Sequence, residues 1–245
     1  MLSICSAICL LFSVQVEALT PHQVLECVEQ VSVASATADI TYVKIDPVLE
    51  RREIRTGTLV YRACVGHKDA AITFDTLIIG RRKETRDKRY VFSGRWFVEI
   101  DPQQKQFIKR ELVSPESAKS LDPFALGNGP VPLPIEQTKE SVLKEFDVAT
   151  VKKPSEGLLS KLDEGVVGIQ LTPKSNSDWA TIDLFYDPNT WFPVGVQTLE
   201  KDGTIRQSRL ENVTLSELTD VQKAQLDIAT PDPKEWSIDI QPYSN

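Results

Sequence analysis

The sequence has few of the residues on which hydrolytic and acid–base catalysis usually depend. It contains only two histidines, His22 and His67, in 245 residues. His22 lies at the start of an expected helix and His67 in a glycine-containing turn, and neither lies near a nucleophile motif. The chain also lacks the His-x-x-x-His and Cys-x-x-Cys pairs that commonly bind metal ions. We therefore expect no catalytic site, no metal site and no cofactor.

Cysteine is scarce as well. Of four cysteines, only Cys27 and Cys64 lie outside the N-terminal apolar run. Two cysteines in an oxidising compartment can form a disulfide. Cysteine is also among the most buried residue types when it is unpaired. The sequence leaves open both a Cys27–Cys64 disulfide, which would join the first helix to a long strand, and two buried free thiols.

Long apolar runs are missing beyond the N-terminus. Residues 2–16 are apolar apart from Ser, Cys and Gln, and the run is shorter than the roughly 20 residues that a membrane-spanning helix needs. Val16-Glu17-Ala18 then supplies a small residue for cleavage, although no Lys or Arg precedes the run. We expect residues 1–18 to be a signal peptide and residues 19–245 to form one exported domain.

The net charge is negative, at −7. An acidic exported protein is not expected to bind nucleic acid, or to adhere to anionic membranes through bulk charge. One basic run, Arg81 to Arg89, could dock an acidic partner or a lipid head group. Because Glu84 and Asp87 balance part of its charge, we interpret it as a solvated connector at a hairpin tip.

The apolar pattern predicts mostly strands. Residues 89–112 alternate β-branched and aromatic side chains around two turns, Ser93-Gly94 and Asp101–Gln104, which is typical of three antiparallel strands. Gly57 marks a bulge or a close approach inside a longer strand. The other expected elements are helices at 20–36, 117–126, 135–146 and 219–226, and strands at 40–45, 54–64, 71–79, near 148, 166–171, 179–186, 194–199, 205–215 and 236–240.

Several of these strands carry apolar residues on one face. Trp96, Val98 and Ile100 share one face of their strand, and Leu184 and Tyr186 share one face of another. Such residues usually form ordinary core. A single curved sheet, however, cannot fill its own concavity, so either helices cover it or a ligand enters.

The order of the elements resembles that of the periplasmic lipoprotein carriers, the LolA-like family, over roughly residues 19–240. Short motifs carry the resemblance in family order, namely the hairpin at 93–102, the short helical segment at 120–126, Leu-Thr-Pro-Lys at 171–174, and the last two strands at 183–188 and 202–213. The resemblance implies a mainly β fold, an unclosed antiparallel β-barrel with the helices at 20–36, 117–126 and 135–146 as plug and lid.

The function that the resemblance implies is non-catalytic transport. The acyl chains of a lipoprotein, or a similar lipid, would be sheltered in an apolar cavity in the periplasm and delivered to the outer membrane. The implied partners are this cargo, an inner-membrane exporter and an outer-membrane acceptor, with the carrier itself a monomer. We expect an acyl ligand to contact apolar strand residues, namely Leu59, Tyr61, Phe74, Phe92, Trp96, Val98, Leu184 and Tyr186.

Two departures from the family keep an alternative open. Where the best-known carriers have Lys-Arg-Pro, with an arginine that helps to hold the lid shut, this chain has Tyr61-Arg62-Ala63, so Arg62 is a shifted candidate for that role. The region 127–164 is also longer than in the compact carriers. A protein of the same fold with a regulatory role, or a structural envelope protein with a filled core, is therefore the competing hypothesis.

Overall fold

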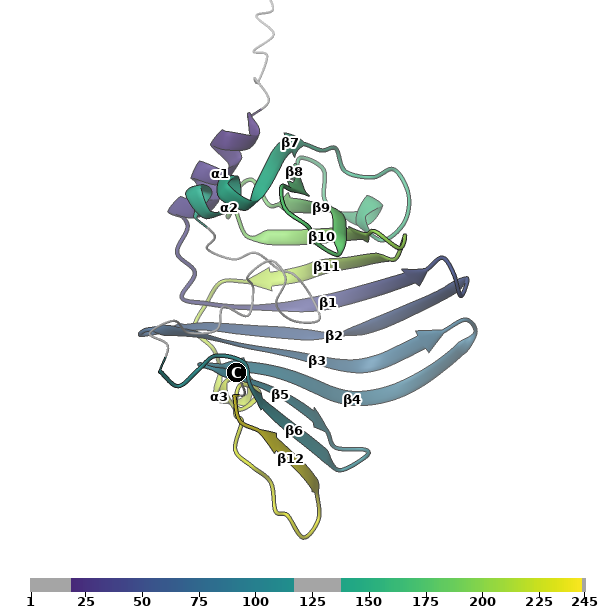
Figure 1. Ribbon diagram of the computed structural model, residues 1–245, viewed down its shortest axis with the longest axis vertical. Helices are drawn as coiled ribbons and strands as arrows, with labels where there is room; N and C mark the ends of the chain where they lie inside the picture. The colour runs from purple at the N-terminus through teal and green to yellow at the C-terminus, as the bar shows by residue number, and fades with distance from the viewer. Residues whose placement is uncertain (1–18, 117–137, 244–245) are drawn as a thin grey trace, which may run out of the picture.

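The computed structural model describes residues 19–116 and 138–243, which build one twelve-stranded sheet (Figure 1). The strand order across the sheet is β12-β6-β5-β4-β3-β2-β1-β11-β10-β9-β8-β7. All neighbours are antiparallel except β12 and β6, which are parallel. The two outermost strands, β12 and β7, do not pair with each other, so the sheet curves without closing. The expected mainly β, unclosed antiparallel architecture is confirmed.

The elements follow one another along the chain as α1 (Pro21–Gln30), β1 (Ser35–Asp46), β2 (Arg51–Cys64), β3 (His67–Ile79), β4 (Arg82–Ser93), β5 (Trp96–Asp101), β6 (Gln106–Glu111), α2 (Lys139–Glu145), β7 (Phe146–Thr150), the short 3-10 helix η1 (Leu159–Lys161), β8 (Val167–Pro173), β9 (Trp179–Tyr186), β10 (Pro193–Glu200), β11 (Ile205–Thr214), α3 (Asp220–Ala224) and β12 (Ser237–Gln241).

The helices are shorter than the sequence pattern predicts. Thr20 and Gln23 form the expected capping box of α1, but the helix ends at Gln30 and β1 already begins at Ser35. The small residues at 35–38 pair with β2 instead of extending the helix. The expected helix at 117–126 lies outside the described residues. Within the described ranges, no helix has the length and apolar character needed to cross a membrane.

The basic run begins at a hairpin tip with exposed residues, as expected, but most of it belongs to strand β4, so its prediction as a connector was wrong. Ile79 pairs with Arg82, which leaves only Gly80 and Arg81 in the turn, where Gly80 has a φ of 59°. A positive φ suits glycine, and a two-residue turn allows both strands to continue to their ends. Arg82 and Glu84 then form an ion pair along β4, 2.7 Å apart.

A pair of adjacent bulges bends the long central strands. The β2–β3 register shifts between Thr56 and Gly57, and the β3–β4 register shifts between Phe74 and Thr76. A bulge adds local twist and bends its strand. Gly57 is required there, because a Cβ atom would lie 1.8 Å from the carbonyl oxygen of Thr73. The expectation that Gly57 marks a bulge or a close approach is confirmed.

Both faces of the sheet are covered. We call the face that packs against α1 and α2 the inner face. Its cluster joins Val24 and Val28 of α1 to side chains of β1–β4 and β7–β11. On the opposite, outer face, Leu218 and Leu226 of the C-terminal segment pack against β2–β6. Leu159 and Leu162 cover Phe185 on the same outer face farther along the sheet.

Replacement of Gly57 should reveal how tightly β2 and β3 approach. We expect Gly57→Ala to lower the free energy of unfolding by more than about 2 kcal/mol, because backbone atoms must shift to admit the methyl group. Urea unfolding followed by circular dichroism measures this change.

Gly94→Ala is the matched control. Gly94 lies in an open turn with a φ of 58°, and its added Cβ would meet nothing within 4 Å. Its cost should be only the conformational strain of about 1–2 kcal/mol. An equal or smaller loss for Gly57→Ala would contradict the close approach.

Candidate functional site

Six of the eight residues expected to contact a ligand lie together on the inner face. They come from four strands and belong to one apolar cluster, and each is at most 3% exposed. These six are Leu59 and Tyr61 of β2, Phe74 of β3, Phe92 of β4, and Leu184 and Tyr186 of β9. We call them the inner floor. Complete burial raises the pKa of the Tyr186 hydroxyl, so this group stays protonated.

Trp96 and Val98 lie on the outer face. Phe97 pairs with Phe92 across the β4–β5 hairpin and packs against the inner cluster, so its neighbours in β5 point the other way. Val98 belongs to the outer cluster, and the Trp96 ring packs against that cluster with the amine of Lys109 4.8 Å from its centre. We therefore leave these two residues out of the inner floor.

A row of aromatic rings borders the inner floor, and sequence reasoning found only part of it. The rings of Tyr42, Phe74, Tyr90 and Phe97 follow one another across β1, β3, β4 and β5, with centroids 6.2, 6.1 and 6.2 Å apart. Such spacings are typical of interacting aromatic pairs. The sequence could have indicated Tyr90, since Tyr90 and Phe92 are two positions apart and so share a face of their strand.

The hydroxyl groups of the two tyrosines in this row accept hydrogen bonds from arginines. Arg206 Nη1 donates a hydrogen bond of 3.4 Å to the Tyr42 hydroxyl, and Arg55 Nη1 donates one of the same length to the Tyr90 hydroxyl. Burial raises the pKa of Tyr42, while the charge of Arg206 opposes the rise. The guanidinium of Arg55 also lies 5.7 Å from the centre of the Phe74 ring. The row thus forms a boundary between apolar and charged surface.

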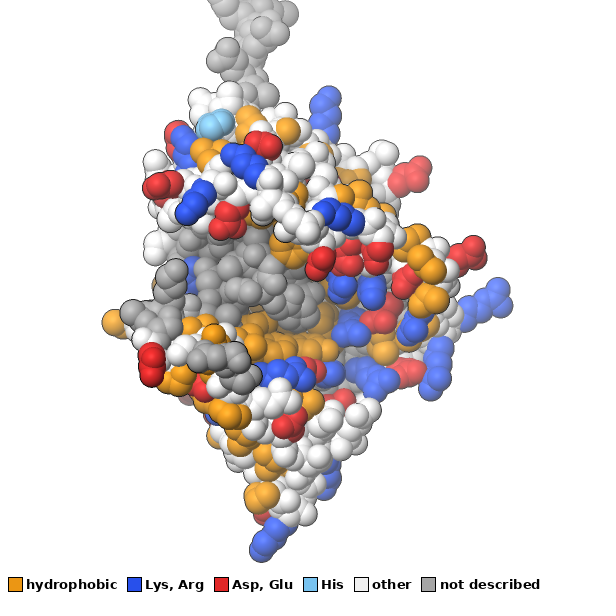
Figure 2. Space-filling model, viewed as in Figure 1, with side chains coloured by type: hydrophobic (Ala, Val, Ile, Leu, Met, Phe, Trp, Pro, Cys, Tyr) orange, Lys and Arg blue, Asp and Glu red, His pale blue; other side chains and the backbone are white. Residues whose placement is uncertain are grey.

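Beyond the row lies a charged band on the same face (Figure 2). Most of its ion pairs link neighbouring strands, and Glu99 takes part in two of these, with Lys88 at 3.1 Å and Arg110 at 2.6 Å. The band comprises Glu53, Arg55, Lys88, Glu99, Arg110, Glu200 and Arg206. A pocket of about 210 Å³ opens where the band meets Phe74 and Tyr90. The inner face therefore offers an apolar floor with a charged margin.

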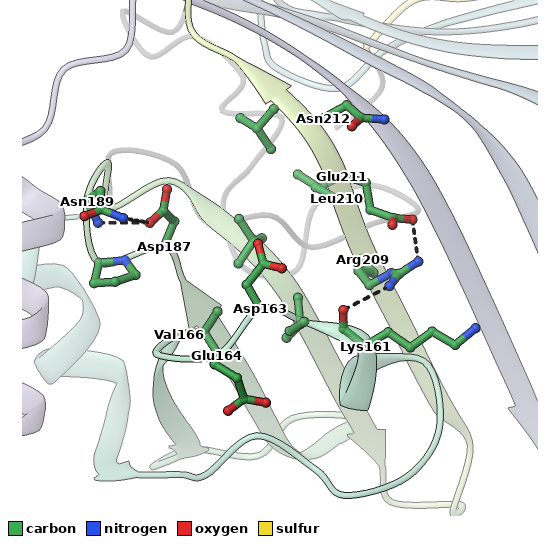
Figure 3. Close-up of a pocket in the computed structure, with 14 residues that line it drawn as sticks. Lys161, Asp163, Glu164, Val166, Asp187, Asn189, Arg209, Leu210, Glu211 and Asn212 are labelled. Atoms are coloured by element: carbon green, nitrogen blue, oxygen red, sulfur yellow. Dashed lines mark hydrogen bonds and ion pairs between the residues drawn. The ribbon is translucent and has the colours of Figure 1, made fainter.

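A larger pocket of about 450 Å³ lies elsewhere, between the segment around η1 and the end of β11 (Figure 3). Its charged lining residues are Lys161, Asp163, Glu164, Asp187, Arg209 and Glu211, so acidic groups outnumber basic ones. Arg209 Nη1 donates to the carbonyl oxygen of Lys161 at 3.1 Å, and the guanidinium also pairs with Glu211. This lining is unsuited to an acyl chain, and none of the residues expected from sequence contributes to it.

Arg62 and Cys64 both lie at the end of the β2–β3 hairpin, on the outer face. Arg62 Nη2 is 2.6 Å from Asp69 Oδ2, so this ion pair joins the two strands of the hairpin. Cys27 and Cys64 are free thiols, and the disulfide that the sequence left open is not formed. The reason is geometric: Cys27 belongs to α1 on the inner face, whereas Cys64 Sγ lies 3.4 Å from Asp69 Oδ2 on the other face.

Comparison with known proteins adds the fold and little more. No family model and no curated protein matches the sequence. Among solved structures, an uncharacterized conserved protein from Thermus thermophilus aligns with 90% of this chain and 98% of its own, at 11% identity and a TM-score of 0.50. At this identity, the likeness shows the fold alone. A LolA superfamily protein from Nitrosomonas europaea covers 83% of this chain and 97% of its own, at 11% identity and a TM-score of 0.35.

The Pseudomonas aeruginosa MucA/MucB complex is also similar, over 86% of this chain and 64% of that one, at 11% identity and a TM-score of 0.44. Sequence identity is low throughout, so these likenesses concern the fold alone. In this sheet, the inner face is the surface whose chemistry can distinguish one function from another.

The charged band should contribute measurably to stability in a pH-dependent manner. Burial alone would raise the pKa of Glu99, but the hydrogen bonds and charges of Arg110 and Lys88 hold it below its usual 4.5. We expect Glu99→Gln to lower the free energy of unfolding by about 1 kcal/mol at pH 7, because two cations lose their partner. The measurement is chemical denaturation from pH 7 to pH 3.

The sign of the pH effect follows from the lowered pKa. A carboxylate whose pKa is depressed on folding contributes stability above its unfolded pKa and loses it as the pH falls through the folded value. The difference in the free energy of unfolding between the parent protein and Glu99→Gln should therefore be largest above pH 4.5 and should decrease below it. The exposed Glu217→Gln serves as the control, and a difference independent of pH would count against the ion-pair network.

Proposed function

We propose that this protein is a non-catalytic carrier that binds the acyl chains of a lipoprotein or a similar lipid on its inner face. The observation that carries the proposal is the inner floor, with aliphatic and aromatic side chains from both halves of an unclosed sheet in one cluster. Concave surfaces with a mainly apolar lining are the usual sites for apolar ligands. The resemblance of the sequence motifs to the LolA-like family implies the same function.

The energetics of such a carrier follow from burial alone. About 0.8 kcal/mol is gained for each methylene group removed from water, so an acyl chain binds without any reaction. The floor residues are at most 3% exposed, so the groups that cover them must separate before a chain can enter. That cost offsets part of the gain, which suits a protein that must also release its cargo to an acceptor.

Export is part of the same proposal. We infer that residues 1–18 are a leader removed on the way to the periplasm, since the apolar run ends at a small residue. The mature protein is expected to begin near Leu19. Intact-mass analysis of the protein recovered from the compartment outside the inner membrane tests this, and a retained leader would overturn the inference.

The direct test is lipid recovery. Protein purified from its own host should yield acyl lipids on solvent extraction, detected by mass spectrometry, and should bind a fluorescent fatty acid that those lipids displace. We expect Phe92→Leu to weaken probe binding by tenfold or more, because the substitution removes an aromatic ring from the floor.

Phe107→Leu is the matched control for this substitution. Phe107 is fully buried, like Phe92, but belongs to the outer cluster. Both variants should lose about 1–3 kcal/mol of stability, whereas only Phe92→Leu should change probe affinity. Equal affinity changes in both variants would show that the probe reports stability and not a site on the inner face.

The near-complete burial of the floor also favours one alternative, a structural or regulatory envelope protein whose core is already filled. The same experiments separate the two functions. Recovery of no lipid, together with no probe binding by the parent protein, would exclude the carrier and leave the filled-core protein.

A further inference from the structure

The β2–β3 hairpin ends in a cluster of potential metal ligands. Cys64 and His67 pair with each other on either side of a two-residue turn, and Asp69 lies two positions beyond His67. Residues paired across a hairpin, or two apart in one strand, share a face of the sheet. The thiol, an imidazole nitrogen and a carboxylate oxygen all lie within 4.8 Å of one another.

The separations are close to those of a tetrahedral site. Cys64 Sγ is 3.4 Å from Asp69 Oδ2, and His67 Nε2 is 3.4 Å from Asp69 Oδ1. Zinc binds sulfur, nitrogen and oxygen ligands at about 2.0–2.3 Å, so tetrahedral ligands lie about 3.3–3.8 Å from each other. The separation of His67 Nε2 from Asp69 Oδ1 is within this range. The thiol lies near the other carboxylate oxygen and would have to move toward Oδ1 to complete three ligands around one ion.

The carboxylate supplies a second, independent observation. Asp69 is 2% exposed, and its Oδ1 is buried without a hydrogen-bond partner among the described residues. His67 Nε2 is near this oxygen but is not aligned to donate to it. A buried acceptor left without a donor is costly, and a cation would satisfy it. The unpartnered oxygen and the ring nitrogen lie 3.4 Å apart.

Arg62 holds the carboxylate in place from the other side. Its Nη2 donates to Asp69 Oδ2 at 2.6 Å, which leaves Oδ1 free to act as a single-oxygen ligand. Partners of this kind orient the groups that contact a metal ion. Access is open, because the turn residue Val65 is fully exposed and His67 is 37% exposed.

We propose that Cys64, His67 and Asp69 bind a divalent transition-metal ion, Zn²⁺ by preference, at the end of the β2–β3 hairpin. The mixed sulfur, nitrogen and oxygen donor set suits zinc, which accepts all three. The thiol proton leaves to solvent as the Cys64 sulfur binds. With three protein ligands, the fourth position of the ion is left to water or to an external ligand.

The test uses the full chain with Cys5→Ser and Cys9→Ser, so that Cys27 and Cys64 are its remaining thiols. Equilibrium dialysis should give one Zn²⁺ per chain. Co²⁺ should give the intense sulfur-to-cobalt charge-transfer absorption of a thiolate complex, and Zn²⁺ should abolish it. Zn²⁺ should also slow the alkylation of Cys64 by iodoacetamide and leave that of Cys27 unchanged.

The chain offers a matched control for each variant. Cys64→Ser and His67→Ala should each weaken Zn²⁺ binding by at least about tenfold, whereas Cys27→Ser and His22→Ala should leave it unchanged. Because His67 is partly exposed, His67→Ala keeps the test valid even if a change at the buried Asp69 unfolds the hairpin. Failure of the parent protein to bind at micromolar Zn²⁺, or equal binding by all four variants, would overturn the proposal. Lipid binding by the inner face is measured separately and does not depend on this outcome.

Discussion

The alternation of side chains along each strand is the constraint on which the rest of this structure depends. A twelve-stranded sheet has two faces, and every strand residue must point to one or the other. Both faces carry apolar clusters, so both need cover. The chain supplies α1 and α2 for the inner face, and the segments around η1 and α3 for the outer face. The position of β12 also follows from this arrangement, because the C-terminal segment crosses the outer face and then pairs with the free edge of β6.

The inner face changes from apolar to charged over a short distance, and the aromatic row makes this change energetically acceptable. Tyrosine has an apolar ring and a polar tip, so it can lie at such a boundary with each end in a suitable environment. Tyr42 and Tyr90 turn their hydroxyls toward Arg206 and Arg55, and Phe74 faces the Arg55 guanidinium with its ring. The acidic partners in the band then limit how much uncompensated charge borders the floor. An amphiphile with an apolar chain and a polar end would find both environments on this one surface.

Much of the fold could be predicted from the sequence, because strand length, turns and bulges are encoded locally. Gly57 and the turns around Gly94 and Pro102 are examples. The site was harder to predict, because its residues depend on which side of each strand lies on the inner face of the sheet. In β5 the sequence offers Trp96 and Val98 on one side and Phe97 on the other, and only pairing with Phe92 shows which side is inner. Local patterns do not contain that information.

The basic run and the hairpin cluster escaped prediction for a related reason. A charged segment was taken for a connector because strands are expected to carry apolar residues, yet Lys88 of this segment lies in the charged band and pairs there with Glu99 of the neighbouring strand. Likewise, Cys64 and His67 match no common metal-binding spacing along the chain. They come together only through a two-residue turn and the register on either side of it. Register is a tertiary property, and single-sequence motifs do not express it.

That register also connects the two faces of the molecule. The strands that bring Cys64, His67 and Asp69 together on the outer face present Leu59 and Tyr61 to the inner floor. A slip of one residue between β2 and β3 would move the side chains of one strand to the opposite face. It would separate Cys64, His67 and Asp69 and would disrupt the inner floor as well. The Arg62–Asp69 ion pair already opposes such a slip, since it joins residues that are directly paired. An ion held by both strands would add a second cross-link at the same end of the hairpin. The group of Cys64, His67 and Asp69 is therefore well placed to fix the geometry of the floor without touching whatever the floor binds.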